Sequence, residues 1–356
     1  MKIALIGCGA VTQAVYVPLL SRRRELFEVS AVCDLSPTLA GAVADRLGAA
    51  GRFTDVGEML PAGGFDAVLV LASGSHGETV RQALDAGYAV LCEKPLSLTR
   101  AEAAALPPDG RLMVGYMKQY DPAVLRAEAL LDGVRIRSVE VTVLHPSGEA
   151  QLAFANLVQA RDADLTQVRK AEAALLDAAL GADAPESLRN LYNVTLGSIC
   201  HDLSLLRRFT GSPERIDHVA AWGEAPGSIE ISGTLPGDSG RFAIRWHYLE
   251  DYPAYRETVA IHHDQGTLEL AFPSPYLMNA PTVLTVVAPG EARTEWREVT
   301  EAFETQLLAF HAFVTTGETP RTGRDGALED IVTAQRIAAR YAVQHGLPLG
   351  GEAREL

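Results

Sequence analysis

The chain of 356 residues has no apolar run that approaches the ~18 residues of a membrane-spanning helix. Its N-terminus, MKIALIGCG, has neither a long apolar region nor a cleavage-site pattern, so we expect a cytoplasmic protein that is not secreted. Positive charge is scarce: 31 lysines and arginines stand against 45 acidic residues, and the formal net charge is −14. Because so acidic a surface repels phosphate backbones, we expect neither nucleic acid nor a membrane as a partner.

Cysteine is scarce as well. The four cysteines are Cys8, Cys33, Cys92 and Cys200, and no two of them form a C-x-x-C pair. Three lie in or beside apolar, strand-like runs, so we expect buried, reduced thiols. No Cys, His or acidic residues cluster at the spacing of a zinc site, and no metal is therefore expected.

The order of apolar runs in the first third of the chain predicts the fold class. Short continuous apolar runs alternate with helical patterns, and continuous runs are typical of parallel strands covered on both faces. This order predicts an α/β domain with a doubly wound parallel sheet and right-handed crossovers. The strand runs are 2–7, 29–34, 67–73, 89–95 and 112–116, and helices are expected at 11–23, 36–48, 76–86 and 99–105.

The pattern changes after Asp121. Most later strand candidates alternate apolar and polar residues and are separated by turn residues, which predicts an α+β domain with a mostly antiparallel sheet. We therefore expect two domains, 1–121 and 122–356. An Ala-rich stretch at 150–190 repeats apolar residues at helical spacing and predicts an amphipathic helical segment. Helices are also expected near 300–316 and at 325–345, and the last of them is a candidate to pack back on the first domain.

The first strand runs into GCGAVT, and a helical pattern follows at once. In a Rossmann turn the first glycine permits the bend, the second lets the backbone approach a pyrophosphate, and the third lets helix and strand pack. Gly7 and Gly9 fill the first two positions, and Thr12 stands in the third. Ala10 and Val11 begin the helix, whose N-terminal N–H groups suit phosphates. The alternative is an ordinary tight turn.

Asp34 ends the second strand run, 22 residues beyond Thr12. A carboxylate at this position accepts hydrogen bonds from the adenosine ribose hydroxyls and repels a 2′-phosphate. No arginine follows Asp34 directly, so the sequence favours NAD over NADP. The alternative is an ordinary turn or cap aspartate in front of Ser36.

Lys94 lies at the C-terminal end of the strand run 89–95, the kind of strand end that lines the ligand crevice of open α/β sheets. Burial and a nearby positive charge lower the pKa of a lysine toward neutrality, which suits proton transfer. The ring of an oxidised nicotinamide carries such a charge. The alternative is a surface lysine at the exit of a strand.

These motifs together resemble the Gfo/Idh/MocA family, which includes glucose–fructose oxidoreductase and inositol dehydrogenase. The resemblance covers nearly the whole chain. It implies a Rossmann domain followed by a domain with a large open sheet, through which members commonly form dimers or tetramers. It also implies hydride transfer between NAD(P) and a sugar, cyclitol or related alcohol. The matching stretches are GCGAVTQAVYVP, SGSHGE (73–78), CEKPLSLT (92–99), VGYMKQYDPA (114–123), DQGTLEL (264–270) and GETPRTGRDGALEDI (317–331).

The resemblance also implies roles for individual residues near the cofactor. Lys94 matches the catalytic lysine of the family, and Glu93 matches the acid before it, which contacts the cofactor or orients the lysine. His76 matches a histidine of the cofactor-binding segment, and Ser73 stands where an asparagine is usual.

A second catalytic element is expected on the helix at 196–211, which matches the family's D-x-x-x-H pattern. His201 takes the place of the histidine, but Gly197 stands where the aspartate is usual. His201 is our candidate for the general base that removes the hydroxyl proton, because an imidazole titrates near the operating pH. The alternative is a hydrogen-bonded core histidine. Candidate substrate contacts are Tyr116, Lys118, Tyr192 and Asn193, with a solvated side chain as the alternative for Lys118.

The sequence thus predicts an oxidoreductase that transfers a hydride between NAD(P) and a hydroxyl or keto carbon of a sugar, cyclitol or sugar derivative. Two alternatives stay open. One is a redox-neutral enzyme that keeps NAD bound and works through a transient keto intermediate, in epimerisation, elimination or glycoside cleavage. The other is a non-catalytic, NAD-binding regulatory protein.

Overall fold

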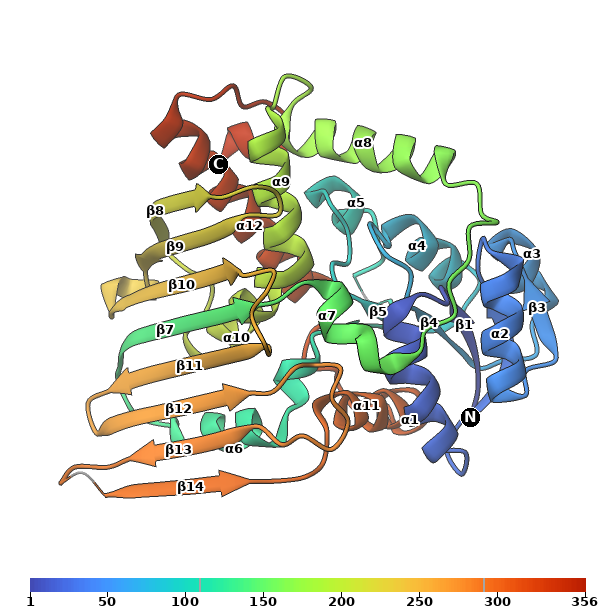
Figure 1. Ribbon diagram of the computed structural model, residues 1–356, viewed down its shortest axis with the longest axis horizontal. Helices are drawn as coiled ribbons and strands as arrows, with labels where there is room; N and C mark the ends of the chain where they lie inside the picture. The colour runs from blue at the N-terminus through green and yellow to red at the C-terminus, as the bar shows by residue number, and fades with distance from the viewer. Residues whose placement is uncertain (109, 291) are drawn as a thin grey trace. The chain divides into compact units, whose positions relative to one another are not determined.

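The computed structural model describes residues 1–108, 110–290 and 292–356. The chain divides into two compact units (Figure 1). Unit 1 comprises Met1–Gly115, Leu152–Leu175 and Gln306–Leu328, and unit 2 comprises Tyr116–Gln151, Leu176–Thr305 and Glu329–Leu356. The chain thus returns to unit 1 twice after first leaving it. The predicted division at residues 121 and 122 stays a prediction.

Unit 1 is built on a six-stranded parallel sheet with the order β3-β2-β1-β4-β5-β6. The central strands β1, β4 and β5 are almost entirely buried, which explains their continuous apolar sequences. The predicted doubly wound Rossmann sheet is confirmed. The strands are β1 (Lys2–Ile6), β2 (Glu28–Cys33), β3 (Gly51–Phe53), β4 (Ala67–Val70), β5 (Ala89–Glu93) and β6 (Leu112–Gly115).

Several helices of this unit have a side-chain cap at their N-terminus. Ser36 caps α2 by accepting from Leu39 N, and Thr99 caps α5 by accepting from Glu102 N. The first helical turn after β1 is a π-helix, a form frequent at functional sites. The segments are η1 (Thr12–Tyr16), α1 (Val17–Arg22), α2 (Pro37–Leu47), α3 (Val56–Ala62), α4 (Gly77–Asp85), α5 (Arg100–Ala104) and α11 (Ala302–Thr316), the last of which begins in unit 2.

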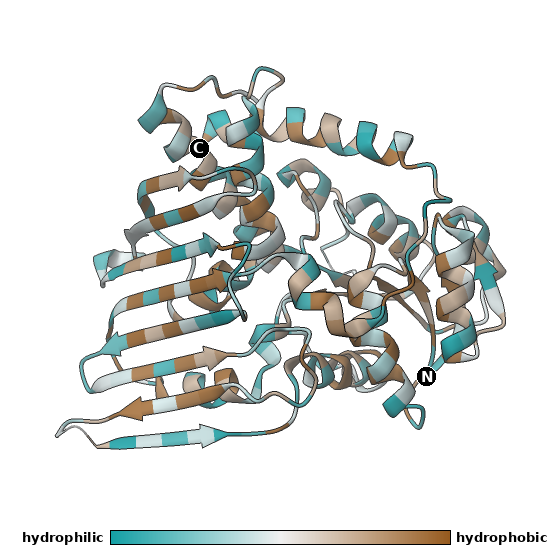
Figure 2. Cartoon of the chain, viewed as in Figure 1, coloured by the Kyte–Doolittle hydropathy of each residue, from teal (hydrophilic) through white to brown (hydrophobic). Residues whose placement is uncertain are grey.

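Unit 2 is built on an eight-stranded sheet with the order β14-β13-β12-β11-β7-β10-β9-β8. All neighbours pair antiparallel except β7 and β10, which are parallel, so the predicted mostly antiparallel sheet is confirmed. Figure 2 shows hydrophilic and hydrophobic residues alternating along several strands, as expected of a sheet with one covered face. The strands are β7 (Ile136–His145), β8 (Arg215–Trp222), β9 (Ser228–Thr234), β10 (Arg241–Tyr248), β11 (Arg256–His263), β12 (Gly266–Phe272), β13 (Val283–Val287) and β14 (Arg293–Arg297).

Helices cover one face of this sheet. Helix α10 contacts β7, and α6 contacts β12 and β13. Figure 1 shows both helices behind the sheet. The remaining helical segments are η2 (Met117–Tyr120), α6 (Pro122–Leu130), α7 (Gly148–Leu152), η3 (Ala153–Ala155), α8 (Thr166–Leu180), α9 (Glu186–Val194), η4 (Thr195–Ile199), α10 (Cys200–Thr210), η5 (Pro236–Asp238), α12 (Arg324–His345) and η6 (Glu352–Glu355).

The prediction of one amphipathic helical segment at 150–190 is wrong in its extent. Residues 156–165 form no helix, and α8 buries only Ala179 and Leu180. Leu165 and Val168, which gave the stretch part of its helical spacing, are 41% and 38% exposed. Apolar spacing alone does not pack a helix, because burial requires a facing surface.

The four cysteines are buried thiols, as predicted. In the part of the chain that the structure describes, no three His, Cys, Asp or Glu side chains gather as metal ligands. Across the same residues, no helix combines the length and the apolar character needed to cross a bilayer.

Candidate functional site

The glycine loop after β1 has one glycine that the fold requires and one that it does not. Gly7 has a φ of +93°, and a Cβ there would lie 2.4 Å from Ala72 N, so only glycine fits. Gly9 has no left-handed φ, and a Cβ there would meet no heavy atom of the described residues within 4 Å. Neither backbone strain nor packing requires a glycine at this position, and close approach of a ligand to the backbone stays its predicted role. The loop therefore fits a dinucleotide.

Thr12 stands where the fingerprint has its third glycine, and its side chain makes a hydrogen bond within the loop. Its side chain is fully buried, and Oγ1 donates to the carbonyl of Gly7 at 2.7 Å. The threonine thus fastens the first helical turn to the start of the loop.

Asp34 joins the ends of β1 and β2. Its Oδ2 accepts from Cys8 N at 2.7 Å, and its Oδ1 accepts from Ser36 N at 2.8 Å. The turn-cap alternative is therefore also realised. A carboxylate has about four acceptor positions, so two bonds leave capacity for the ribose hydroxyls.

Glu93 anchors the turn that carries Lys94. Its Oε1 accepts from Tyr16 Oη at 2.7 Å, and Tyr16 Oη in turn accepts from Gln306 Nε2 at 3.1 Å. The backbone N–H of Lys94 donates to the other Glu93 oxygen at 3.3 Å. Burial raises the pKa of Glu93, and the charge of Lys94 acts in the opposite direction. Lys94 itself is half-buried directly after β5.

His76 also contacts the turn that carries Lys94, through the carbonyl of Pro95. The ring is buried, with Nδ1 2.5 Å from the carbonyl oxygen of Pro95 and Nε2 2.5 Å from that of Ala72. The ring therefore links the loop after β4 to the loop after β5. Ser73 lies exposed in the first of these loops. Contact of His76 and Ser73 with the cofactor stays a prediction.

The predicted cofactor residues of unit 1 thus lie at the carboxyl ends of β1, β2, β4 and β5. Strand β1 lies between β2 and β4 in the sheet, which is where the strand order reverses. Ligands of open α/β sheets bind in the crevice at this reversal. The loop at Gly9, the acid at the end of β2 and the Lys94 turn fit NAD(P) in that crevice.

A segment that we call the strap (Leu152–Leu175) follows this carboxyl edge within unit 1. Gln13, in the first turn after the glycine loop, holds it through two bonds to Val158, accepting from its N at 2.8 Å and donating to its O at 3.2 Å. Asp162 accepts hydrogen bonds from Ser36 Oγ and from Thr38 N. Local sequence patterns do not indicate where the strap lies, because these contacts join residues more than 100 positions apart.

In unit 2, His201 lies in the first turn of α10, which continues from a π-helical turn. η4 precedes α10 directly, and Gly197 lies exposed within it. A Cβ at Gly197 would meet no heavy atom of the described residues within 4 Å, so the missing aspartate leaves open space. His201 is half-buried, and its ring meets the edge of the Tyr116 ring at a centroid distance of 6.4 Å.

The other predicted substrate residues of unit 2 differ in burial. Tyr116 and Tyr192 are buried, whereas Asn193 is exposed. Burial and the nearby Asp330 carboxylate raise the pKa of Tyr116 well above its usual value. Asp330 also forms a bidentate ion pair with Arg207, at 3.0 Å for both contacts. Contact of these tyrosines and of Asn193 with substrate stays a prediction.

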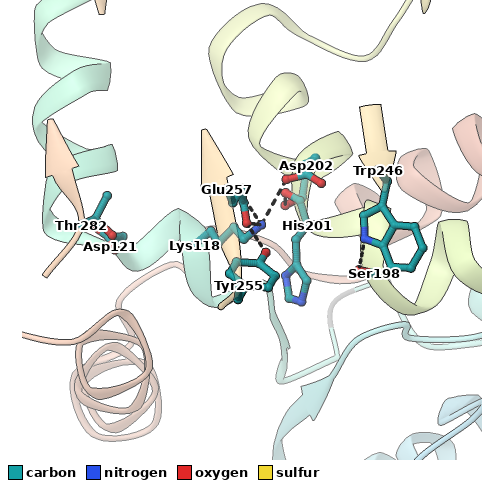
Figure 3. A network of polar contacts seen from close by, with 10 residues as sticks. Lys118, Asp121, Ser198, His201, Asp202, Trp246, Tyr255, Glu257 and Thr282 are labelled. Atoms are coloured by element: carbon teal, nitrogen blue, oxygen red, sulfur yellow. Dashed lines mark hydrogen bonds and ion pairs between the residues drawn. The ribbon is translucent and has the colours of Figure 1, made fainter. Parts of the chain in front are cut away.

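Lys118 lies at the centre of a buried charge cluster (Figure 3). Its Nζ is 2.6 Å from both carboxylate oxygens of Glu257 and 3.1 Å from Oδ1 of Asp202. Tyr255 Oη donates a further hydrogen bond to Glu257. Lys118 is only 6% exposed, so the alternative of a solvated lysine is wrong. It lines a pocket with Tyr255, Glu257 and Phe272, and its contact with substrate stays a prediction.

The cluster contains two carboxyl groups, of Asp202 and Glu257, but only one lysine that contacts them among the described residues. Burial raises the pKa of Asp202 to about 8, with Lys118 acting against the shift and Glu257 adding to it. Burial disfavours the charged form of Lys118, but Asp202 and Glu257 outweigh it and raise the pKa of the lysine. Burial therefore favours a protonated Asp202 near neutral pH, beside the Lys118 ammonium group.

This arrangement predicts a pH-dependent stability. Above its ordinary pKa of 3.8 an unfolded Asp202 releases a proton that the folded state keeps up to about pH 8. The folded state then binds more protons, so the free energy of unfolding falls as pH rises through this window, by at most about 1.4 kcal/mol per pH unit. Asp202→Asn, which resembles the protonated acid, is expected to flatten this slope in urea unfolding between pH 5 and 8. An unchanged slope would contradict the assignment to Asp202.

The chain is similar to known proteins in sequence and in fold. Residues 1–107 match a family model described as an oxidoreductase family with an NAD-binding Rossmann fold. The chain is 26% identical over 351 residues to D-xylose 1-dehydrogenase (NADP(+)) 2 of Haloferax volcanii. The alignment covers 95% of this chain and 96% of that protein. It is 36% identical over 140 residues to inositol 2-dehydrogenase of Ralstonia nicotianae, covering 37% of this chain and 41% of that protein.

A solved structure shows the same fold over nearly the whole chain. The crystal structure of a dehydrogenase from Chromobacterium violaceum superimposes with a TM-score of 0.73 at 14% identity. The match covers 97% of this chain and 96% of that one.

Proposed function

Because the chain belongs to the Gfo/Idh/MocA family of NAD(P)-dependent oxidoreductases, we propose that it moves a hydride between nicotinamide and a carbon of a sugar, cyclitol or sugar derivative. The reacting carbon carries a hydroxyl in one direction and a keto group in the other. The observation that carries the proposal is the glycine loop, in which neither a positive φ nor packing requires a glycine at position 9, together with Lys94 in a hydrogen-bonded turn at the same sheet edge.

We assign the cofactor as NAD in preference to NADP. The support is Asp34, whose carboxylate is fixed by Cys8 N and Ser36 N at the end of β2. A carboxylate there favours a free 2′-hydroxyl over a 2′-phosphate. The full-length relative from Haloferax volcanii is named for NADP, so the preference rests on this chain's own residues.

When bound, NAD would supply or accept the hydride through its nicotinamide. Gly7, Gly9 and the N–H groups of the first helical turn would hold the pyrophosphate. In our assignment Lys94 exchanges the proton of the reacting hydroxyl, with Glu93 and His76 fixing the turn that carries it. His201 acts as the general base in the same proton transfer, and the open space at Gly197 admits a larger substrate group.

The strap favours a second candidate function. A segment that runs along the cofactor edge, held at Gln13 and Ser36, would slow the release of NAD. Slow release suits a redox-neutral enzyme, which oxidises a substrate and then reduces the intermediate without exchanging the cofactor. Turnover of a sugar substrate without net NADH formation would identify this function.

We further propose a cytoplasmic homodimer or homotetramer. Four buried thiols fit a reducing compartment. The large sheet of unit 2 supports assembly through its open face, where Arg245 of β10 lies near Glu140 of β7 and Glu230 of β9. Mass measurement in solution by light scattering tests the assembly.

Paired fluorescence titrations with NADH and NADPH test the proposed function. The purified protein is first checked by absorbance for cofactor that has co-purified. We expect NADH to bind at least roughly tenfold more tightly than NADPH, because a carboxylate at the ribose repels the extra phosphate. A screen of sugars and cyclitols with NAD⁺ should then yield NADH. Failure of folded, cofactor-free protein to bind either nucleotide would refute the proposal.

A further inference from the structure

The strap places a second acidic residue beside the expected cofactor ribose. We propose that Asp162 is a cofactor-specificity residue that, together with Asp34, excludes the 2′-phosphate of NADP. The inference rests on the proposed function, because it concerns the same dinucleotide site. It assigns part of the NAD preference to the middle of the chain, outside the Rossmann motif.

Asp162 occupies the donors that a phosphate would need. Ser36 Oγ donates to its Oδ1, and Thr38 N donates to its Oδ2 at 3.1 Å. Both donors stand at the N-terminus of the 11-residue helix α2, where backbone N–H groups attract anions. The two hydrogen bonds lower the pKa of Asp162 to about 2, so the carboxylate is charged at neutral pH.

The position of these donors links them to the ribose. Ser36 N donates to Asp34, the carboxylate expected to bind the ribose hydroxyls, while the hydroxyl of Ser36 donates to Asp162. A 2′-phosphate next to Asp34 would therefore meet a second carboxylate, and the α2 N–H groups that could hold it are already used. A 2′-hydroxyl carries no charge and meets no such repulsion.

The strap does not depend on Asp162 alone for its place. Gln13 and Val158 exchange two hydrogen bonds at the glycine loop. Farther along, Glu172 lies so close to Gly74, in the loop after β4, that a Cβ there would be 1.7 Å from Glu172 Oε1. Removing the Asp162 carboxylate should therefore leave the strap in position and open the donors of α2 to another anion.

Three variants test the role of Asp162 through binding alone. Asp162→Ala removes the charge and frees the donors, and Asp162→Asn removes the charge while keeping the side-chain size. Asp164→Ala is the matched control, because it removes the same charge from the strap. Its carboxylate accepts a hydrogen bond from Thr166 N at 2.9 Å, at the start of α8 and away from the donors of α2. The readout is the dissociation constants of NADH and NADPH by fluorescence titration.

We expect Asp162→Ala to lower the ratio of the NADPH to the NADH dissociation constant by roughly tenfold, as the loss of a charge at a helix N-terminus suggests. Asp162→Asn should give a smaller change in the same direction, and Asp164→Ala should give none. An unchanged ratio, an equal loss of both affinities, or an equal change in Asp164→Ala would overturn the role of Asp162. Wild-type protein that binds neither nucleotide would instead refute the proposed function itself.

Discussion

Lys94→Met is expected to reduce turnover by about 10²–10⁴-fold, the range that loss of a general acid or base produces. The dissociation constant of NADH should change no more than a few-fold. The physical reason is that Lys94 directly follows β5, with its backbone N–H bonded to Glu93, whereas the predicted phosphate-binding loop lies after β1. Steady-state kinetics on the substrate found in the screen, together with an NADH titration of each variant, measures both effects.

Two control variants sharpen this experiment. Lys94→Arg keeps the positive charge, but a guanidinium does not give up its proton near neutral pH. If Lys94 transfers a proton, the arginine variant should be nearly as inactive as Lys94→Met. Lys2→Met removes a surface lysine, 55% exposed, and should leave kcat unchanged. The role assigned to Lys94 is wrong if Lys94→Met keeps its kcat or if its NADH affinity falls in step with turnover.

Local sequence predicts those features of the fold that depend on residues close together in the chain. β1, β4 and β5 are buried on both faces, so each one reads as a continuous apolar run. The tight turn at Gly7 requires a glycine within the motif itself. β3 escaped prediction because it has only three residues and no apolar run.

The parts that local sequence misses have distant partners. Lys118 pairs with Glu257, 139 positions later, and nothing around Glu257 marks an acid on a strand as buried. The apolar spacing of the strap predicted one helical segment, but residues 156–165 form no helix, and the strap is held by side chains at Gln13 and Ser36. Such contacts depend on how the chain folds back, and a motif search along one segment does not detect them.

Lys118→Met is expected to destabilise the protein by about 3–5 kcal/mol, the usual cost of removing one partner of a buried ion pair. The substitution deletes the only ammonium group that contacts Asp202 and Glu257 among the described residues. Glu257 is fully buried, so water does not replace the lost partner. Urea unfolding followed by circular dichroism gives the free energy of unfolding for both proteins, provided that their m-values agree.

A double variant separates the loss of charge pairing from the loss of side-chain packing. Lys118→Met/Glu257→Gln removes the uncompensated carboxylate as well, and Asp202 is already protonated near neutral pH because burial raises its pKa to about 8. If unpaired charge causes the destabilisation, the double variant should recover a large part of the stability that Lys118→Met loses. If the lost contact of Lys118 with the Phe272 ring and its other neighbours is the cause, the second substitution should recover nothing. Because Lys118 lines the pocket of unit 2, the stabilised double variant also allows its substrate role to be measured in folded protein.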